Sequence, residues 1–245
     1  QSERNLGGAG GFKHALNWLA MNRHSAYSGK NVWLVLFDDD ANPHPECNIA
    51  ANLAKASLQF PSADILAAAV INEYDEPLAM NDVLIRVPES LTDQLRMPLH
   101  RSAYTARPRL GPVCAQASSF VGCFIRYDVA CQHLQFLEEK LFLYFDDVLF
   151  THRLVLAGCS LIYYPELVFV HRVPKMRGRI SPPWKLYFYA RNMWRLHRIY
   201  SPRWFLVSIA LRIIKTSITI CLHRFHTRRS FHLLFKGVID GFKND

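Results

Sequence analysis

A short apolar run that stops at three consecutive aspartates most constrains how this chain can fold. Residues 32–37 read Val-Trp-Leu-Val-Leu-Phe, and Asp38, Asp39 and Asp40 follow at once. An apolar run of this length without polar alternation is typical of a parallel strand buried on both faces of a sheet. Ligand sites of such sheets lie at the carboxyl ends of the strands. The run therefore predicts an α/β fold with an acidic site at one edge of the sheet.

Adjacent carboxylates at a strand end destabilise the fold, because they repel one another and lose hydration. A divalent cation offsets that cost, and oxygen ligands at positions i and i+2 suit Mg²⁺ or Mn²⁺ shared with a diphosphate. We therefore interpret Asp38 and Asp40 as candidate metal ligands. An exposed acidic turn without an ion is the open alternative.

Helix and strand signals alternate along the first 180 residues, which we predict to form one catalytic domain. Helices are expected over residues 13–22, 49–60, 128–136 and 148–157, and strands over residues 65–70, 119–126, 161–164 and 167–170. Residues 75–112 hold five prolines and little periodicity, which predicts an irregular insert. Gly158 follows the last of these helices and is a good C-cap.

A glycine-rich segment, Asn-Leu-Gly-Gly-Ala-Gly-Gly-Phe, occupies residues 5–12. Glycines let a backbone approach a ligand closely, and the N-terminus of a following helix favours anions. The segment predicts a ligand-binding loop ahead of the first helix. It matches neither the dinucleotide fingerprint nor the P-loop, so a loop that serves only packing is the alternative.

Two further positions carry side chains suited to chemistry. Asp146 and Asp147 open an expected helix, where one carboxylate can cap the helix and the other can accept a proton from a hydroxyl nucleophile. His171 ends an apolar strand, and its neutral imidazole could be a third metal ligand. Capping alone and a purely structural histidine are the alternatives.

Charge is divided unevenly along the chain. Residues 172–245 hold 16 Lys and Arg against 2 Asp and Glu, whereas residues 1–171 hold 13 against 18. Residues 184–200 predict a helix with aromatic and basic faces, and residues 204–222 are the most apolar stretch. Arg212 and Lys215 interrupt that stretch, which favours an amphipathic helix on an anionic membrane surface over a membrane span. We expect residues 181–245 to form a helical, membrane-associating region; a solvated basic helix is the alternative.

The six cysteines include no CxxC pair, and most lie in apolar runs. This pattern is typical of reduced, buried thiols in a cytosolic protein.

In their order and spacing these motifs resemble glycosyltransferase family 2, most closely its galactofuranosyl- and rhamnosyltransferase-like branch. The segments that carry the resemblance are residues 5–12, 37–41, 144–150 with Arg153, 157–158, 164–171, 187–192 and 236–241. The resemblance implies the GT-A fold, a Rossmann-like mixed sheet flanked by helices, here with a C-terminal helical region that is basic and aromatic. It also implies inverting sugar transfer from a UDP-galactofuranose or dTDP-rhamnose type donor to a hydroxyl of a cell-surface glycan or lipid-linked acceptor.

The resemblance gives each candidate residue a role. The residues implied to bind the nucleotide-sugar donor are Asn5, Gly7, Gly8, Asp38, Asp39 and Asp40. The implied metal ligands are Asp38, Asp40 and His171, and the implied ion is Mn²⁺ or Mg²⁺. Asp147 is the implied general base, and Asp146 is the alternative base or its orienting neighbour.

Family members begin with a strand, a helix and a second strand that together bind the nucleotide. The resemblance implies that these elements precede Gln1, so we expect an N-terminally incomplete sheet with an exposed edge, and little transfer by this chain alone. It also implies a bacterial enzyme in the cytoplasm, peripheral on the inner face of the cell membrane, with no nucleic-acid partner.

Two other functions stay open. One is a non-enzymatic protein that binds nucleic acid or membrane through its basic region, although no helix-turn-helix, zinc or RNA-recognition pattern is present. The other is a nucleotidyltransferase, which needs a basic triphosphate-binding loop. Only Arg4 and Lys13 lie near the glycines, which disfavours that function.

Overall fold

The computed structural model describes residues 4–22, 32–106, 111–173, 180–223 and 227–243. Its residues form two compact units, each described here by itself. The sheet unit consists of Gln1–Val87, Ser102–Lys140 and Asp146–Val173. The helical unit consists of Pro88–Arg101, Leu141–Phe145 and Pro174–Asp245.

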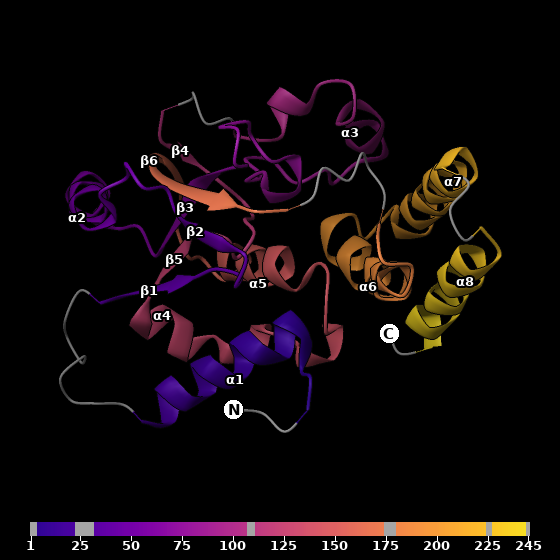
Figure 1. Cartoon of the computed structure of the whole chain (residues 1–245), viewed down its shortest axis with the longest axis horizontal. Coiled ribbons are helices and arrows are strands. Elements are labelled where there is room, and N and C mark those ends of the chain that lie inside the picture. Colours follow the sequence, from indigo (N-terminus) through magenta and orange to yellow (C-terminus); the bar gives the residue numbers. More distant parts are fainter. Residues whose placement is uncertain (1–3, 23–31, 107–110, 174–179, 224–226, 244–245) are drawn as a thin grey trace. The chain divides into compact units, whose positions relative to one another are not determined.

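The sheet unit is built on a six-stranded mixed sheet (Figure 1). Its strands are β1 (Trp33–Leu36), β2 (Ala41–Pro43), β3 (Ile65–Ile71), β4 (Val113–Cys114), β5 (Cys123–Arg126) and β6 (Leu161–His171). The strand order is β1-β5-β3-β6-β2, with β4 also pairing to β6. Only β3 and β6 pair in parallel. The expected mixed sheet flanked by helices is confirmed at this level of detail.

Helices cover both faces of the sheet because the residues of the central strand alternate between two apolar clusters. Ile65, Ala67 and Ala69 of β3 pack in a cluster that includes Leu16, Ala130 and Phe150. These three belong to α1 (Gly7–Met21), α4 (Tyr127–Gln132) and α5 (Asp146–Leu156). The intervening residues of β3 pack on the other face, where the cluster includes Ala56 of α2 (Ile49–Gln59). All seven residues of β3 are buried, as expected for a strand covered on both faces.

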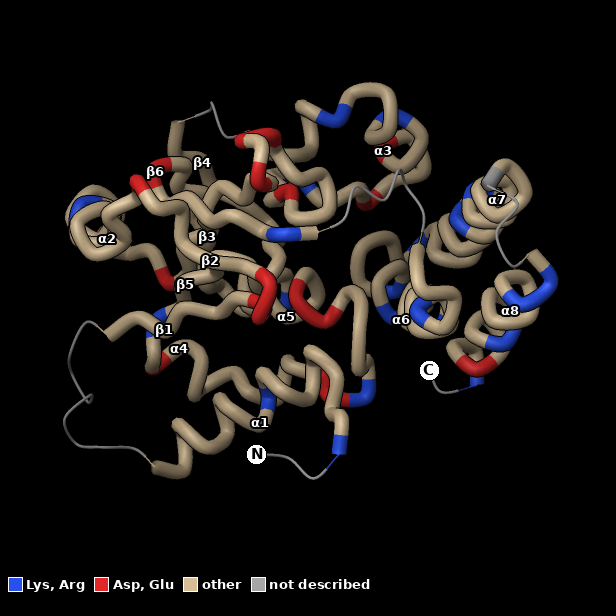
Figure 2. Tube along the Cα trace, in the orientation of Figure 1, with Lys and Arg blue, Asp and Glu red and all other residues tan. Residues whose placement is uncertain are grey.

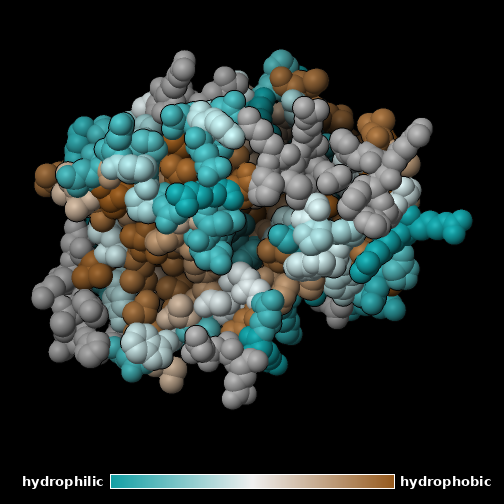
Figure 3. Space-filling model, in the orientation of Figure 1, coloured by the Kyte–Doolittle hydropathy of each residue, from teal (hydrophilic) through white to brown (hydrophobic). Residues whose placement is uncertain are grey.

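Two strand predictions are wrong in detail. β1, expected to be a buried parallel strand, pairs antiparallel with β5, and only Leu36 of its four residues is buried. It lies at one end of the strand order, and among the described residues no strand pairs with its other edge. Figure 3 shows hydrophobic side chains exposed on the visible face beside β1. The two short strands expected around Pro165 are one strand, β6, whose pairing with β3 shifts register at that point.

The proline-containing stretch over residues 75–112 contains short elements that the sequence pattern did not predict. They are a 3₁₀ turn at Ala79–Asn81, helix α3 at Leu91–Arg96 and a 3₁₀ turn at Arg101–Ala103. A capping box between Ser90 and Asp93 starts α3. Two more 3₁₀ turns, Leu134–Phe136 and Glu139–Leu141, lie between α4 and α5.

Three helices dominate the helical unit: α6 (Lys185–Tyr200), α7 (Phe205–His223) and α8 (Thr227–Lys243). The backbones of α6 and α8 approach closely at Gly237 and Gly241, which lie four residues apart on one face of α8. A Cβ at Gly237 would lie 2.4 Å from the Tyr187 carbonyl oxygen, and one at Gly241 would lie 2.5 Å from that of Arg191. Larger residues at either position would therefore push the two helices apart.

A strained segment of the helical unit is held by one buried amide. Phe142, Tyr144 and Phe145 have positive φ angles, which bulky residues rarely adopt. The side-chain nitrogen of Asn192 donates to the carbonyl oxygens of Leu141, Leu143 and Tyr144, at 2.8–3.1 Å. Asn192 is 2% exposed, so these bonds are shielded from water and offset the strain.

Candidate metal site and carboxylate pair

The pairing of β2 with β6 brings the aspartate turn to His171. Ala41, the first residue of β2, lies opposite His171, the last residue of β6. The Ala41 N–H donates to the Asp38 carbonyl oxygen at 3.1 Å, which closes the turn, and the Arg172 N–H donates to that of Asp40 at 2.9 Å. Two segments about 130 residues apart in sequence are thus fixed side by side by backbone hydrogen bonds.

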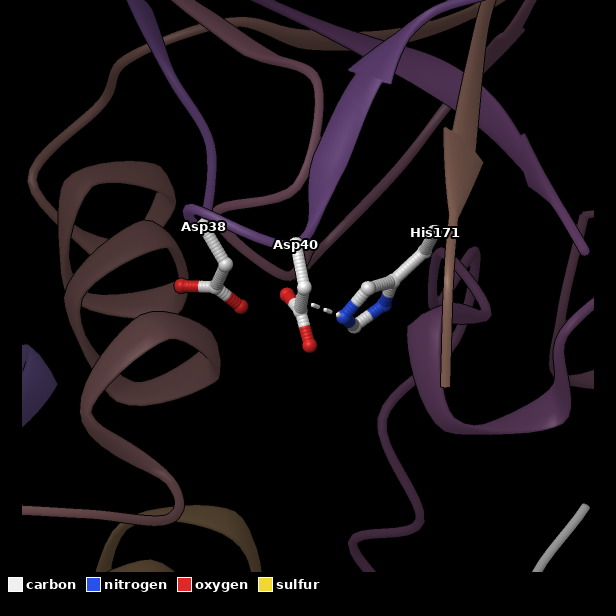
Figure 4. Close-up of side chains that lie close together, drawn as sticks. All are labelled: Asp38, Asp40 and His171. Carbon is white, nitrogen blue, oxygen red and sulfur yellow. Dashed lines mark hydrogen bonds and ion pairs between the residues drawn. The ribbon is translucent and has the colours of Figure 1, made fainter. Parts of the chain in front are cut away.

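Asp38, Asp40 and His171 form a cluster of potential metal ligands. One ligand atom from each lies within 4.8 Å of the others. His171 Nε2 lies 3.0 Å from Asp40 Oδ1, and Figure 4 shows the imidazole directed at that carboxylate. Asp38 and Asp40 project to the same side of the turn, as expected for positions i and i+2, whereas Asp39 is exposed and lies outside the cluster.

A hydrogen-bonded chain that the sequence did not reveal holds His171 in place. Its Nδ1 lies 2.9 Å from Asn81 Oδ1, and Asn81 Nδ2 donates to Ser119 Oγ at 3.1 Å. All three side chains are buried. An amide oxygen only accepts hydrogen bonds, so Nδ1 donates to Asn81, and Nε2 faces the carboxylates. Asn81 lies in the irregular stretch, where no periodic pattern marked it.

The donor set fits a hard divalent cation. Two carboxylates and one imidazole suit Mn²⁺, and two carboxylates suit Mg²⁺. Ligand atoms of one octahedral ion of this size lie about 3.0 Å apart when adjacent and about 4.2 Å apart when opposite, and His171 Nε2 and Asp40 Oδ1 already have the adjacent spacing, at 3.0 Å. A buried histidine whose other nitrogen is hydrogen-bonded is the usual arrangement at metal sites.

The acidic pair forms the N-terminus of α5. The Asp147 carboxylate accepts the Val148 N–H at 2.7 Å and the backbone N–H of Phe120. Asp146 is buried and Asp147 is half-buried. Thr151, one turn further along α5, exchanges hydrogen bonds of 2.9 Å with the backbone of Ser118, which anchors the helix in the sheet unit.

Electrostatic interaction links the acidic pair to the aspartate turn. Burial raises the pKa of Asp146, and the charges of Asp147 and Asp38 raise it further. Burial also raises the pKa of Asp147, and Asp38 adds to this, but backbone hydrogen bonds limit the shift. Figure 2 shows the two acidic segments next to each other. The pair therefore holds protons more strongly than exposed carboxyl groups do, and a cation at Asp38 would lower both pKa values.

The glycine-rich segment is mostly helix, which corrects the predicted loop. α1 begins at Gly7, and Asn5 Oδ1 accepts the Gly7 N–H at 2.9 Å. A Cβ at Gly8 would lie 3.6 Å from Asp146 Oδ2, so the start of α1 adjoins the acidic pair. Helical hydrogen bonding overrides the low propensity of glycine here, because Ala9 and Leu16 of α1 are buried in the sheet unit.

The structure also describes Arg153, which belongs to a segment that carries the resemblance, and the cysteines. Arg153 donates to the Phe136 carbonyl oxygen and pairs with Glu138, so its contacts are internal. All six cysteines are free, but Cys114 and Cys221 are exposed, so burial of the thiols is only partly confirmed.

The structure therefore brings Asp38, Asp40 and His171 into one cluster and places Asp146 and Asp147 within its electrostatic reach. No protein-family model and no curated protein matches the chain.

Proposed function

We propose that this protein is a glycosyltransferase that transfers a sugar from a nucleotide-sugar donor to an acceptor hydroxyl with inversion. The proposal rests on two separate groups of acidic side chains, one suited to binding a metal and one suited to accepting a proton. Asp38 and Asp40 form a metal-type cluster with His171, and a separate buried carboxylate pair lies within electrostatic reach of that cluster. Metal-assisted transfer to a hydroxyl needs both a cation site and a base.

The cluster would hold the donor. Bound Mn²⁺ or Mg²⁺ would neutralise the charge that builds on the departing nucleoside diphosphate. Asp38 and Asp40 supply carboxylate oxygens, and Asn81 keeps Nε2 of His171 turned toward the same point. The N-terminus of α1, with Asn5, Gly7 and Gly8, is placed beside Asp146 and offers N–H groups to the donor.

Asp147 is the better candidate for the general base. The backbone N–H groups of Val148 and Phe120 hydrogen-bond its carboxylate and favour its ionised form. It is also the more exposed of the two. The acceptor oxygen attacks the anomeric carbon, its proton passes to Asp147, and the bond to the diphosphate oxygen breaks through a transition state with oxocarbenium character.

The fold and the resemblance together suggest the substrates. A mixed sheet flanked by helices, with the acids at strand ends, is compatible with the GT-A fold. The donor would be of the UDP-galactofuranose or dTDP-rhamnose type, and the acceptor a cell-surface glycan or lipid-linked saccharide. The protein would act in the cytoplasm, peripheral on the inner face of the membrane.

Metal binding and transfer test the two halves of the site separately. Mn²⁺ binding is measured by isothermal titration calorimetry, and transfer by a donor screen with Mn²⁺ or EDTA, repeated with any residues encoded upstream of Gln1 restored. Asp38→Ala and Asp40→Ala should abolish Mn²⁺ binding. Asp147→Asn should leave Mn²⁺ bound while transfer loses about 2–4 kcal/mol of transition-state stabilisation.

Glu46→Gln, which changes an exposed acid outside the cluster, is the matched control and should alter neither quantity. Undiminished transfer in EDTA, or Mn²⁺ affinity that Asp40→Ala does not change, would refute the proposal.

A further inference from the structure

Helix α7 presents its apolar side to solvent, which is the reverse of the usual arrangement. The exposed residues of its segment Phe205–Leu222 are Leu206, Val207, Ala210, Ile214, Lys215, Ile218, Cys221 and Leu222. Their spacing of three and four residues makes one stripe, in which Lys215 is the single charge. Of the 18 residues in this segment only Ser208 and Ile209 are buried. Such a stripe on a surface helix marks an interaction site.

Two polar residues of α7, Ser208 and Arg212, are directed inward and already have partners. Ser208 Oγ lies 3.2 Å from Ser201 Oγ and donates to the Trp204 carbonyl oxygen at 2.9 Å. Arg212 donates to Tyr189 Oη of α6 at 3.0 Å. Burial alone would raise the pKa of Tyr189, but the charge and hydrogen bond of Arg212 lower it. The helix cannot therefore turn its apolar side inward without breaking these buried contacts.

Helix α8 adds a second apolar stripe bordered by cations. Phe235, Ile239 and Phe242 recur at helical spacing and are each at least half exposed. The exposed cations of the same helix are Arg228, Arg229, Lys236 and Lys243. Aromatic and aliphatic side chains flanked by Lys and Arg are typical of helices that lie in the interface of an anionic bilayer.

We infer that α7 and α8 bind an anionic bilayer surface through these two stripes. The charge balance supports an anionic bilayer rather than a second copy of this chain. Residues 172–245 carry 16 cations against 2 anions, so two copies would repel each other, whereas anionic lipid would attract them.

An in-plane position fits α7 better than a span. Phe205–Leu222 is the one helical segment of the described residues that is long and apolar enough to cross a membrane. Its inward side, however, carries Arg212 and packs on α6, which holds Arg191, Arg195 and Arg198. Crossing the bilayer in this packing would draw those cations into hydrocarbon. This inference names the surface that would hold the protein in the peripheral membrane position proposed above, and it does not depend on sugar transfer.

Vesicle co-sedimentation tests the inference with the chain as it stands. Binding is expected to vesicles of phosphatidylcholine and phosphatidylglycerol at low salt, to weaken on addition of salt, and to be far weaker with phosphatidylcholine alone. The double change Ile214→Glu and Ile218→Glu should lower the partition coefficient at least about tenfold. Leu58→Glu, on an exposed apolar residue of α2, is the matched control and should leave it unchanged.

A second variant keeps the test independent of apolar packing. Arg228→Glu with Arg229→Glu changes only exposed cations and should weaken binding to anionic vesicles at least about tenfold, with circular dichroism unchanged. Alkaline carbonate should release the bound protein. Retention after carbonate would overturn the in-plane position. No binding at low salt, or self-association that the Ile214 and Ile218 changes abolish, would overturn the bilayer as the occupant.

Discussion

The sheet unit buries its most apolar segment, whereas the helical unit exposes its own. Every residue of β3 is buried between two layers of helices, but only two residues of the apolar segment of α7 are. The hydrophobic effect is the same in both places. In β3 it contributes to the free energy of folding, and in α7 it remains available for association. Apolar composition alone therefore does not show whether a segment will pack in the core or stay exposed for association.

The two units also differ in how they place charge. Acids of the sheet unit converge at the turn after β1 and at the start of α5, where the charge of Asp38 raises the pKa values of Asp146 and Asp147. Exposed cations of the helical unit are dispersed over its helices α6, α7 and α8: Arg198, Lys215, Arg228, Arg229, Lys236 and Lys243. Converging like charges favour a small multivalent counter-ion, and dispersed ones favour an extended surface of opposite charge. The two charge patterns thus match the two proposed partners, a divalent metal and an anionic bilayer.

Matched truncations, one in each unit, test the difference in burial between the two units. Phe169→Ala removes a fully buried ring of the sheet unit and should lower the free energy of unfolding by about 3–5 kcal/mol. Ile218→Ala, on the exposed stripe of α7, should change it by less than about 0.5 kcal/mol without lipid. Urea denaturation followed by circular dichroism measures both. Equal losses would mean that the α7 stripe is buried in the folded chain.

A smaller effect is expected from the residue that orients His171. Asn81→Ala removes the acceptor for Nδ1 and should weaken Mn²⁺ binding about 10–100-fold. Asn81→Asp retains a side-chain acceptor there and should restore most of the affinity. Gln59→Ala, at the exposed end of α2, serves as control. Calorimetric affinities that do not differ among the three variants would exclude a positioning role for Asn81.

The smallest predicted effect comes from the buried acid that lacks a counter-ion. Burial and the Asp147 charge raise the pKa of Asp146 to about 8, so the folded state binds this proton more tightly than the unfolded state. Its ionisation therefore lowers stability progressively as pH rises from about 4 toward 8. Asp146→Asn should raise the free energy of unfolding by about 1–2 kcal/mol at pH 8.

That gain should vanish below about pH 4, where the wild-type carboxyl is protonated in both states. Saturating Mn²⁺ should shrink it, because the cation offsets the charge of Asp38. Thermal unfolding followed across pH, with and without Mn²⁺, tests these points. A destabilised Asp146→Asn protein at pH 8 would show that the ionised carboxylate is stabilising.

Patterns of local origin predicted much of the fold. The helix expected over residues 49–60 is α2, the strand over residues 65–70 is β3, and Gly158 has the positive φ of a C-cap. These features depend on neighbours within a few residues, so periodicity and capping rules reveal them. The predicted direction and burial of β1 were both wrong, because an apolar run does not identify the strand beside it or show whether a further strand covers its other edge.

The residues of the candidate site also include some that the sequence revealed and some that it did not. Asp38, Asp40 and His171 were proposed as metal ligands from their positions at strand ends and from the resemblance. Asn81 and Ser119 were missed, because a buried amide that holds a histidine has no spacing rule. The clamp of Asn192 on a segment with three positive φ angles was missed for a similar reason, since the partners are almost 50 residues apart.

From the sequence alone we predicted the element types along most of the chain and the separation of acidic and basic regions. The sequence also showed which side chains could bind a cation or accept a proton. Only the tertiary structure decided that Ala41 pairs with His171, that the charge of Asp38 reaches the start of α5, and that α7 turns its polar side inward. The physical reason is range. Helix and strand signals act between near neighbours, whereas pairing register and packing depend on contacts between distant residues.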